Sequence, residues 1–401
     1  MSRPTAPSRR RLPGLDDDLP DEVRHHVPTL TLARLVGNAA FRFPVPFLAV
    51  IAHSLGVPLT TMGEAASAGE FTGLLAPLFG RRVDRSRRVS AMTVGLAIVA
   101  VGALVASLSP GPAALAVGFV TISLGKLAFD PAVGAWVADR VDYRRRGRVT
   151  GFMELSWAGA MLVVVPVLGL LVAGPGWRWG YGVLAVAAAA MTVVVRRRLR
   201  DEPSVVAHHE DSRLQFDRVT LVGVAGFATL LTASSAIFVV FGAWLGDTFG
   251  ISAAGIGLAA VLFGVAELAA TTLSIRLTDR LGKLRAVSLG AGLMIPAALS
   301  LGITGRHLVT GLLSFALFGF GFEFAIVSAI PIIVELQPRA RASALGLASG
   351  TGTVGRGLMI IVSTRVYAAH GVGASGVLGA GCALVVVLVF GFGLRGQTRL
   401  R

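Results

Sequence analysis

Charged residues are scarce in this sequence. Of its 401 residues, 15% are Asp, Glu, Lys or Arg, whereas 54% are hydrophobic and the mean hydropathy is +0.73. Because a soluble domain is about 25% charged, this composition excludes an ordinary soluble protein. It indicates an integral membrane protein.

Other absences exclude further classes of protein. The only cysteine, Cys382, leaves no partner for an intramolecular disulfide and no cysteine metal site. The sequence contains neither a Gly-x-x-x-x-Gly-Lys-Ser/Thr loop for ATP nor a His-Glu-x-x-His zinc motif. His208 and His209 fall in a polar segment and are interpreted as a solvated pair rather than metal ligands. We therefore expect no enzyme activity, no cofactor and no metal.

Long apolar runs take up most of the chain, and twelve of them are close to or above the ~20 residues that a membrane-spanning helix needs. Helices are expected because lipid offers the backbone no hydrogen-bond partners. The predicted fold class is an all-α membrane protein with twelve transmembrane helices. The segments are 30–52, 61–79, 90–108, 113–137, 150–173, 179–195, 219–245, 252–274, 286–304, 308–335, 343–367 and 373–394.

Polar segments divide these helices into two groups of six. The first residues, 1–28, are rich in proline and charge, which predicts a disordered cytosolic tail. Residues 29–195 form the first predicted six-helix bundle, and residues 219–394 form the second. The charged segment 196–218 is the predicted cytosolic loop between them, and residues 395–401 form a second cytosolic tail.

Lys and Arg are distributed very unevenly among the loops. The two tails and every second loop carry 30 of them, whereas the remaining loops carry only Arg178 and Arg306. By the positive-inside rule, both termini lie in the cytosol and the protein lies in the cell membrane. The net charge of +15 therefore reflects topology and not nucleic-acid binding.

An internal repeat relates the two bundles. Asp84 and Asp279, each followed by Arg in a short basic loop, are 195 residues apart. Gly151 and Gly346, each at the start of an apolar segment, are also 195 residues apart. Two landmarks at one offset indicate a parallel repeat of six helices, which predicts a binding site between the halves near the bilayer midplane.

The repeated loops resemble the signature of the major facilitator superfamily, Gly-x-x-x-Asp-Arg-x-Gly-Arg/Lys-Arg/Lys. The first copy contains Gly80, Asp84, Arg85 and Arg88, and the second contains Asp279, Arg280, Gly282 and Lys283. The run Pro166-Val167-Leu168-Gly169 is similar to the Gly-Pro-x-x-Gly-Gly motif of the drug/proton antiporter branch. The resemblance implies two six-helix halves and alternating access.

These loop residues, together with Asp139 and Arg140 behind the segment 113–137, are the predicted cytosolic gate. Asp84 and Asp279 precede apolar helices, where a carboxylate is favoured by the helix dipole. The nearby arginines would pair with these carboxylates or with the neighbouring loops and hold the cytosolic side shut in one state. The alternative is that the arginines only set the topology.

Ionisable residues inside the membrane are the candidate substrate and proton site, because each costs about 2.5–3.5 kcal/mol or more unless it faces a cavity or a partner. Asn38 adds a possible hydrogen bond to substrate or to a neighbouring helix. The charged residues near the midplane are Arg42, Glu70, Lys126, Asp130, Glu267, Glu323 and Arg356.

Pairing is expected among these charges. Lys126 and Asp130 are four residues apart on one helix, which favours an ion pair. Arg42 is expected to pair with Glu70 and Glu323 with Arg356, because their segments are adjacent. Asp130, beside Pro131, is the preferred acid for proton or substrate coupling. The alternative is that all of these are static structural pairs.

The sequence predicts a secondary transporter, with proton-coupled efflux of small amphipathic compounds as the main hypothesis. Uptake of a nutrient or metabolite is the alternative, and Arg42, Lys126 and Arg356 would then suit an anionic substrate. A non-transporting membrane sensor or scaffold is the rival from another class. The expected partners are a small-molecule substrate, protons and the lipid bilayer, and we expect a monomer.

Overall fold

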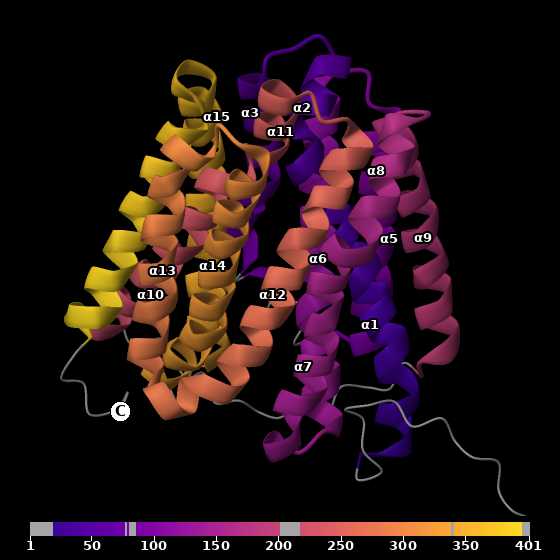
Figure 1. Ribbon diagram of the computed structural model, residues 1–401. Helices are drawn as coiled ribbons and strands as arrows, with labels where there is room; N and C mark the ends of the chain where they lie inside the picture. Colours follow the sequence, from indigo (N-terminus) through magenta and orange to yellow (C-terminus); the bar gives the residue numbers. More distant parts are fainter. Residues whose placement is uncertain (1–18, 77, 80–85, 201–216, 338–340, 395–401) are drawn as a thin grey trace, which may run out of the picture.

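The chain folds as a bundle of helices that stand roughly side by side (Figure 1). The computed structural model describes residues 19–76, 78–79, 86–200, 217–337 and 341–394, and these residues form no strand. The first half contributes α1 (Asp21–Arg42), α2 (Pro44–Ser54), α3 (Leu59–Phe71), the 3₁₀ turn η1 (Thr72–Leu75), α5 (Arg88–Leu108), α6 (Pro112–Arg140), α7 (Tyr143–Gly159), the π-helical turn η2 (Ala160–Val164), α8 (Val165–Ala173) and α9 (Trp177–Arg198). The second half contributes α10 (Arg218–Phe238), α11 (Phe241–Phe249), α12 (Ala253–Leu281), α13 (Lys283–Thr304), α14 (Leu308–Leu336), α15 (Arg341–Leu388) and the π-helical turn η3 (Val389–Gly393).

Nine helical stretches of the described chain are long and apolar enough to cross a membrane, or ten if the bent pair of α1 and α2 is one span. α15 is too long for a single crossing, because its 48 residues would extend about 72 Å through a hydrocarbon core of about 30 Å. Gly371 interrupts it with φ 76° and ψ −174°, a conformation that glycine adopts without a Cβ clash.

The first helix begins earlier than the sequence predicts. α1 starts at Asp21, so eight residues of the predicted tail 1–28 are helical. Val23 and Val27 lie one turn apart, are fully buried, and belong to the same apolar cluster as Trp136 of α6. This packing outweighs the local signals of proline and charge, and it holds Pro28 inside the helix.

Each half begins with a divided helix. In the first half, Phe43 separates α1 from α2, Pro44 is the first residue of α2, and the two axes meet at 42°. Proline is suited to the first position of a helix because it lacks the N–H that would be unpaired there. In the second half, Val239 and Val240 separate α10 from α11. The break in the first half leaves Arg42 at the end of α1, beside the opposite half.

Two pairs of glycines bring neighbouring helices into backbone contact. A Cβ on Gly95 of α5 would lie 2.8 Å from the carbonyl oxygen of Gly125 of α6. In the second half, a Cβ on Gly290 of α13 would lie 2.7 Å from the carbonyl oxygen of Gly321 of α14. Small residues allow such close approach of helices in membranes. The two contacts are 195 and 196 residues apart along the chain.

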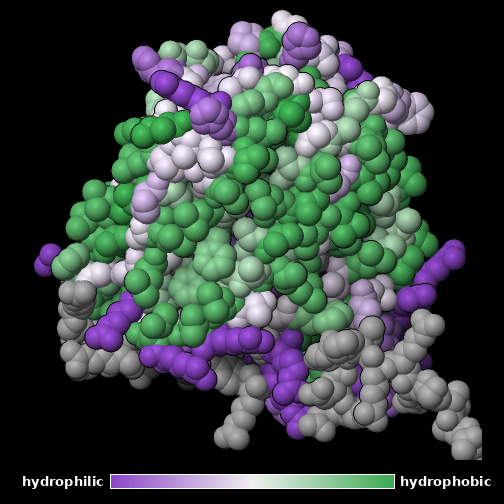
Figure 2. All heavy atoms as spheres, viewed as in Figure 1, coloured by the Kyte–Doolittle hydropathy of each residue, from purple (hydrophilic) through white to green (hydrophobic). Residues whose placement is uncertain are grey.

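The outer surface carries a broad hydrophobic belt, with hydrophilic residues gathered toward the two ends of the bundle (Figure 2). Large apolar side chains in this belt are strongly exposed, among them Ile303 at 79% and Val186 at 71%. An apolar surface of this extent requires an apolar solvent. The protein is therefore a multi-pass membrane protein.

Candidate functional site

A buried ion pair joins the two halves near the middle of the bundle. Arg42 of α1 donates from Nη1 to Oε2 of Glu267 at 3.0 Å and from Nη2 to Oε1 at 2.5 Å. Arg42 Nη1 also donates to the carbonyl oxygen of Trp157 at 3.0 Å, and its guanidinium lies 4.3 Å from the indole centroid. Both carboxylate oxygens are bonded, so this pair has the two-point geometry that makes arginine–carboxylate contacts strong.

A second buried ion pair also joins the halves, but here the arginine comes from the second half and the glutamate from the first. Arg356 of α15 contacts Oε1 of Glu70 of α3 through Nη2 at 2.9 Å. Oε2 of Glu70 and Nε of Arg356 are buried and have no hydrogen-bond partner. The guanidinium of Arg356 lies 5.9 Å from the ring centroid of Phe41, and Lys126 Nζ lies at the same distance from that ring. This pair is therefore only half satisfied.

The two pairs occupy related places in the chain. Glu70 and Glu267 are 197 residues apart, and each binds an arginine of the other half. The predicted pairs Arg42–Glu70 and Glu323–Arg356 are therefore wrong. They followed from helix adjacency within one half, whereas both arginines reach across the interface between the halves.

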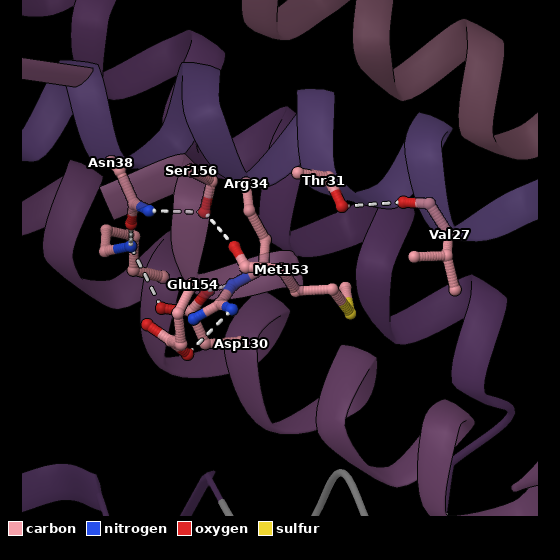
Figure 3. Close-up of polar contacts among 9 residues, drawn as sticks. Val27, Thr31, Arg34, Asn38, Asp130, Met153, Glu154 and Ser156 are labelled. Carbon is pink, nitrogen blue, oxygen red and sulfur yellow. Dashed lines mark hydrogen bonds and ion pairs between the residues drawn. The ribbon is translucent and has the colours of Figure 1, made fainter. Parts of the chain in front are cut away.

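A cluster of charges within the first half lies along one face of α1 (Figure 3). Lys126 Nζ contacts Oδ2 of Asp130 at 2.9 Å, which confirms the predicted pair. Arg34 lies between two carboxylates, 3.0 Å from Oε1 of Glu154 and 3.6 Å from Oδ1 of Asp130. The formal charges of these two cations and two anions cancel.

Asn38 connects this cluster to a neighbouring helix. Its Oδ1 accepts from Lys126 Nζ at 2.6 Å, and its Nδ2 donates to Oγ of Ser156 at 3.1 Å (Figure 3). Ser156 in turn donates to the carbonyl oxygen of Met153 at 2.6 Å. Of the two predicted roles of Asn38, the bond to an adjacent helix is the one formed here.

Glu323 of α14 has a different environment. Thr271 of α12 donates to its Oε1 at 3.0 Å, and no Lys or Arg of the described chain lies within ion-pair distance. One turn further along, the buried hydroxyls of Ser274, Thr278 and Ser328 lie 2.8–3.0 Å from one another. Glu323 follows Lys126 by 197 residues, so the second half places a carboxyl group where the first half places a cation.

Some residues of the predicted gate form ion pairs, and each of these pairs lies within one half. Arg88 Nε contacts Oδ2 of Asp139 at 3.0 Å. The corresponding pair of the second half is Lys283 with Glu335, since Lys283 follows Arg88 by 195 residues and Glu335 follows Asp139 by 196. Arg140 contacts Glu22 at the start of α1 at 3.0 Å. These contacts define the basic end of the bundle.

The other gate residues are less engaged. Asp279 and Arg280 are exposed at the end of α12 and form no ion pair with another side chain that the structure describes. Gly282, with φ 83°, makes the sharp turn into α13. The predicted gate residues Gly80, Asp84 and Arg85 lie outside the described residues.

At the far end, opposite the basic end, the halves pack closely. A Cβ on Gly242 of α11 would lie 1.8 Å from the carbonyl oxygen of Pro46 of α2, so the two backbones touch. Arg365 of α15 also contacts Glu64 of α3 at 2.7 Å. One face of α12 carries a shallow, open hollow of about 320 Å³, and its lining residues all belong to that helix: Val265, Leu268, Ala269, Thr272, Leu273 and Arg276.

Sequence reasoning missed several residues of this site. Arg34 is not among the candidate residues named from the sequence, although Arg34, Asn38 and Arg42 follow at four-residue spacing and therefore share one face of α1. That spacing is the signal that identifies Arg34. Phe41, Trp157 and Thr271 have no comparable signal, because an aromatic or hydroxyl residue in an apolar helix is ordinary.

Comparison with known families gives a match over nearly the whole chain. The model of the Major Facilitator Superfamily matches residues 30–228 and 222–399. The chain is 23% identical over 294 residues to the MFS-type transporter YwfA of Bacillus subtilis (strain 168), covering 68% of this chain and 70% of that protein. A shorter match, 31% identical over 117 residues, covers 28% of this chain and 17% of the siderophore transporter fer7 of Mycosarcoma maydis.

Solved structures share the fold at low sequence identity. A bacterial homologue of the human lysosomal transporter Spinster, crystallised in an inward-facing and unoccupied conformation, has a TM-score of 0.70 at 13% identity, with 93% of this chain and 95% of that chain covered. The human organic anion transporter MFSD10 (TETRAN) has a TM-score of 0.70 at 18% identity, with 92% and 100% covered. Identities this low show a common fold alone.

Proposed function

Because this chain belongs to the major facilitator superfamily, we propose that it moves a small amphipathic compound across the cell membrane by alternating access, driven by the proton gradient. The observation that best supports this function is the pair of buried ion contacts between the halves, Arg42–Glu267 and Arg356–Glu70. Charges at this depth face a cavity or a partner. Because each of these ion pairs joins the two halves, its residues can change partners only if the halves move.

The proposed architecture is twelve crossings in two six-helix halves, residues 29–195 and 219–394. α1 with α2, α3 with η1, and α7 with α8 each form one crossing of the first half, beside α5, α6 and α9. In the second half, α10 with α11 forms one crossing, α12, α13 and α14 form one each, and α15 forms two that meet at Gly371. The 195-residue offset of Arg88 and Lys283, and of Gly95 and Gly290, supports the repeat.

The proposed orientation puts both termini in the cytosol, as the distribution of Arg and Lys favours. Single cysteines at Gly111→Cys and Val205→Cys, in a Cys382→Ser background, test it with a membrane-impermeant maleimide on intact cells. Gly111→Cys is expected to label from outside and Val205→Cys only after lysis. The opposite result would reverse the orientation.

In this orientation the far end, where Gly242 of α11 meets Pro46 of α2, is extracellular and closed. The conformation is then inward-facing. In the outward-facing state the predicted gate, including Gly80, Asp84 and Arg85, closes the cytosolic side. Arg88 and Asp139, two other residues of that predicted gate, pair within the first half here.

Two directions of transport have support. The similarity of Pro166–Gly169 to the drug/proton antiporter motif favours export, and Gly169 of that motif packs directly on Gly257 of α12 in the opposite half. The cationic groups of Arg42, Lys126 and Arg356 in the middle of the bundle favour uptake of an anionic compound instead. Asp130 contacts Lys126 at 2.9 Å and lies 3.6 Å from Arg34, and our proposal gives it a structural role in this cluster rather than a role in coupling.

Flux measurements in proteoliposomes test the function. The purified protein is reconstituted and a panel of cationic, neutral and anionic amphipathic compounds is followed with and without an imposed pH gradient. Accumulation that depends on the gradient, lost with its collapse by an ionophore, is the expected result. Flux of every compound equal to that of protein-free vesicles would instead support a non-transporting sensor or scaffold.

A further inference from the structure

The two ion pairs that join the halves differ in how well their atoms are satisfied. In the Arg42–Glu267 pair, both carboxylate oxygens accept hydrogen bonds, and Arg42 has a third acceptor in the carbonyl of Trp157. In the Arg356–Glu70 pair, one carboxylate oxygen and the Nε donor are buried without partners. Glu70 itself is only 7% exposed. A buried polar atom without a partner is a cost that folding normally avoids.

The surroundings of Arg356 combine positive charge with an apolar surface. The ring of Phe41 lies 5.9 Å from the guanidinium of Arg356 and 5.9 Å from the ammonium of Lys126. The two cationic groups therefore lie within about 12 Å of each other, and both face the ring of Phe41. Of these two cationic groups, Lys126 already contacts Asp130 and Asn38, whereas Nε of Arg356 is left without an acceptor.

We propose that Arg356 is the binding group for the carboxylate of an organic anion, which replaces Glu70 on the guanidinium while Glu70 takes up a proton. This inference rests on the proposed transport function and names its substrate class. A carboxylate can accept from Nε and one Nη of arginine together, a two-point contact that Glu70 does not make here. The apolar body of the substrate, best an aromatic ring, packs against Phe41.

The charges balance through this exchange. Before binding, the positive charge of Arg356 is matched by the negative charge of Glu70. After binding it is matched by the substrate carboxylate, and the displaced Glu70 must be neutral because a carboxylate without a partner is costly at this depth. One proton therefore binds with each anion, and both travel in the same direction. Where the proton gradient points into the cell, this stoichiometry selects uptake over export.

Other charged groups around Glu70 are already paired or distant along their helices. α3 packs against α2, η1, α6 and α15. η1 carries no charged residue, and α6 presents Lys126 bound to Asp130. The remaining charged or titratable groups on the membrane-embedded parts of these elements are His53, Glu64, Arg365, Tyr367 and His370, which lie toward the far end, and Cys382, which follows Gly371 in α15. Arg356 is thus the cation on which the charge of Glu70 depends.

Three probes with the same apolar body test the substrate class: benzoate, benzamide and benzylamine, which are anionic, neutral and cationic. Binding to the purified full-length protein is measured by titration calorimetry in two buffers of different ionisation enthalpy, which also gives the number of protons taken up. Benzoate is expected to bind at least about tenfold more tightly than the other two, with uptake of one proton.

Variants assign this behaviour to residues. Arg356→Gln is expected to weaken benzoate binding about tenfold or more, and Arg356→Lys, which keeps the charge but loses the planar two-point contact, by less. Glu70→Gln is expected to retain binding but to lose the proton uptake and the pH dependence. Glu64→Gln is the matched control, because Glu64 lies on the same helix and pairs with another arginine of α15, yet both side chains are exposed. It is expected to change neither affinity nor proton uptake.

Several results would overturn the proposal. The first is binding of benzylamine or benzamide that is as tight as that of benzoate or tighter, and the second is no binding of benzoate. The third is proton uptake that is undiminished in Glu70→Gln, whether or not the variant Glu323→Gln abolishes that uptake. Thermal unfolding of each variant, compared with wild type, separates loss of the site from loss of the fold. If benzoate binds with proton uptake but is not carried into proteoliposomes, the site stands and the transport function fails. If other compounds are transported without an anion preference, the transport function stands and the site fails.

Discussion

The two buried ion pairs between the halves can be compared almost atom for atom. Each joins an arginine of one half to a glutamate of the other, and the two glutamates are 197 residues apart. Arg42 and Glu267 share two hydrogen bonds, and Arg42 also binds a backbone carbonyl. Arg356 and Glu70 share one contact and leave two buried atoms unpaired. Related positions have therefore acquired different roles: one pair holds the halves together and the other is able to exchange.

The local backbone explains part of this difference. Arg42 is the last residue of α1, where Pro44 starts a new helix at an angle of 42°. Its third acceptor, the carbonyl of Trp157, comes shortly before the π-helical turn η2 (Ala160–Val164). Such turns interrupt the regular ladder of a helix and are common at functional sites. Arg356 has no such break nearby, since the interruption in α15 is at Gly371.

The largest expected effect comes from breaking the satisfied pair. Arg42→Gln leaves Glu267 buried without its cation, and loss of one partner of a buried pair costs about 3–5 kcal/mol. Arg356→Gln is expected to cost clearly less, because Glu70 forms a single contact and can be neutralised by a proton. Thermal unfolding of both variants in the same detergent measures the difference. Equal losses of stability would remove the distinction between the two pairs.

An intermediate effect is expected at the far end, where the halves touch without charge. Gly242→Ala places a methyl group against the carbonyl oxygen of Pro46, and overpacking of this kind costs about 1–3 kcal/mol. The closed state is therefore destabilised, and α2 and α11 separate. Spin labels at His53→Cys and Thr248→Cys, in a Cys382→Ser background, are expected to report longer distances.

Gly246→Ala is the control for that experiment. It lies one turn further along α11, and a Cβ there would meet nothing within 4 Å. Its distance distribution is expected to match that of the parent protein. A shift in both variants would show that helix propensity, and not the contact with Pro46, controls closure.

The smallest effect is expected at the basic end, where the two halves are alike. Arg88→Gln and Lys283→Gln break the contacts with Asp139 and with Glu335, which lie within a half and are partly exposed. Pairs of this kind contribute about 1 kcal/mol or less, so both variants should unfold within a few degrees of wild type and at similar temperatures. A large effect of only one of them would mean that this pair also contacts the opposite half.

The architecture was largely accessible from the sequence, because it depends on local patterns. Apolar runs bounded by arginine-rich loops predict the helices, and the helix starts at Arg88 and Lys283 fall within three residues of the predicted boundaries. The start of α1 was not accessible, because Val23 and Val27 become helical through burial against Trp136, which lies more than 100 residues away in the chain.

The candidate site was accessible only in part. The depth of each charge follows from counting residues along a helix, and Lys126 with Asp130 follows from four-residue spacing. The partners of Arg42 and Arg356 depend on how the two halves face each other, and no local pattern records that arrangement. The sequence also does not predict which atoms of Glu70 and Arg356 lack a partner, because that depends on the positions of single side-chain atoms.

The glycine contacts between α5 and α6 and between α13 and α14 limit how this sequence can vary. Gly95 and Gly125, like Gly290 and Gly321, leave less than 3 Å between a new Cβ and the facing backbone. Even alanine would push the helices apart, and no rearrangement of side chains can relieve a clash with backbone. In a library of all single substitutions, these four positions would stand out as intolerant in two pairs, 195 and 196 residues apart. Mutational tolerance would thus reveal the repeat without any structure.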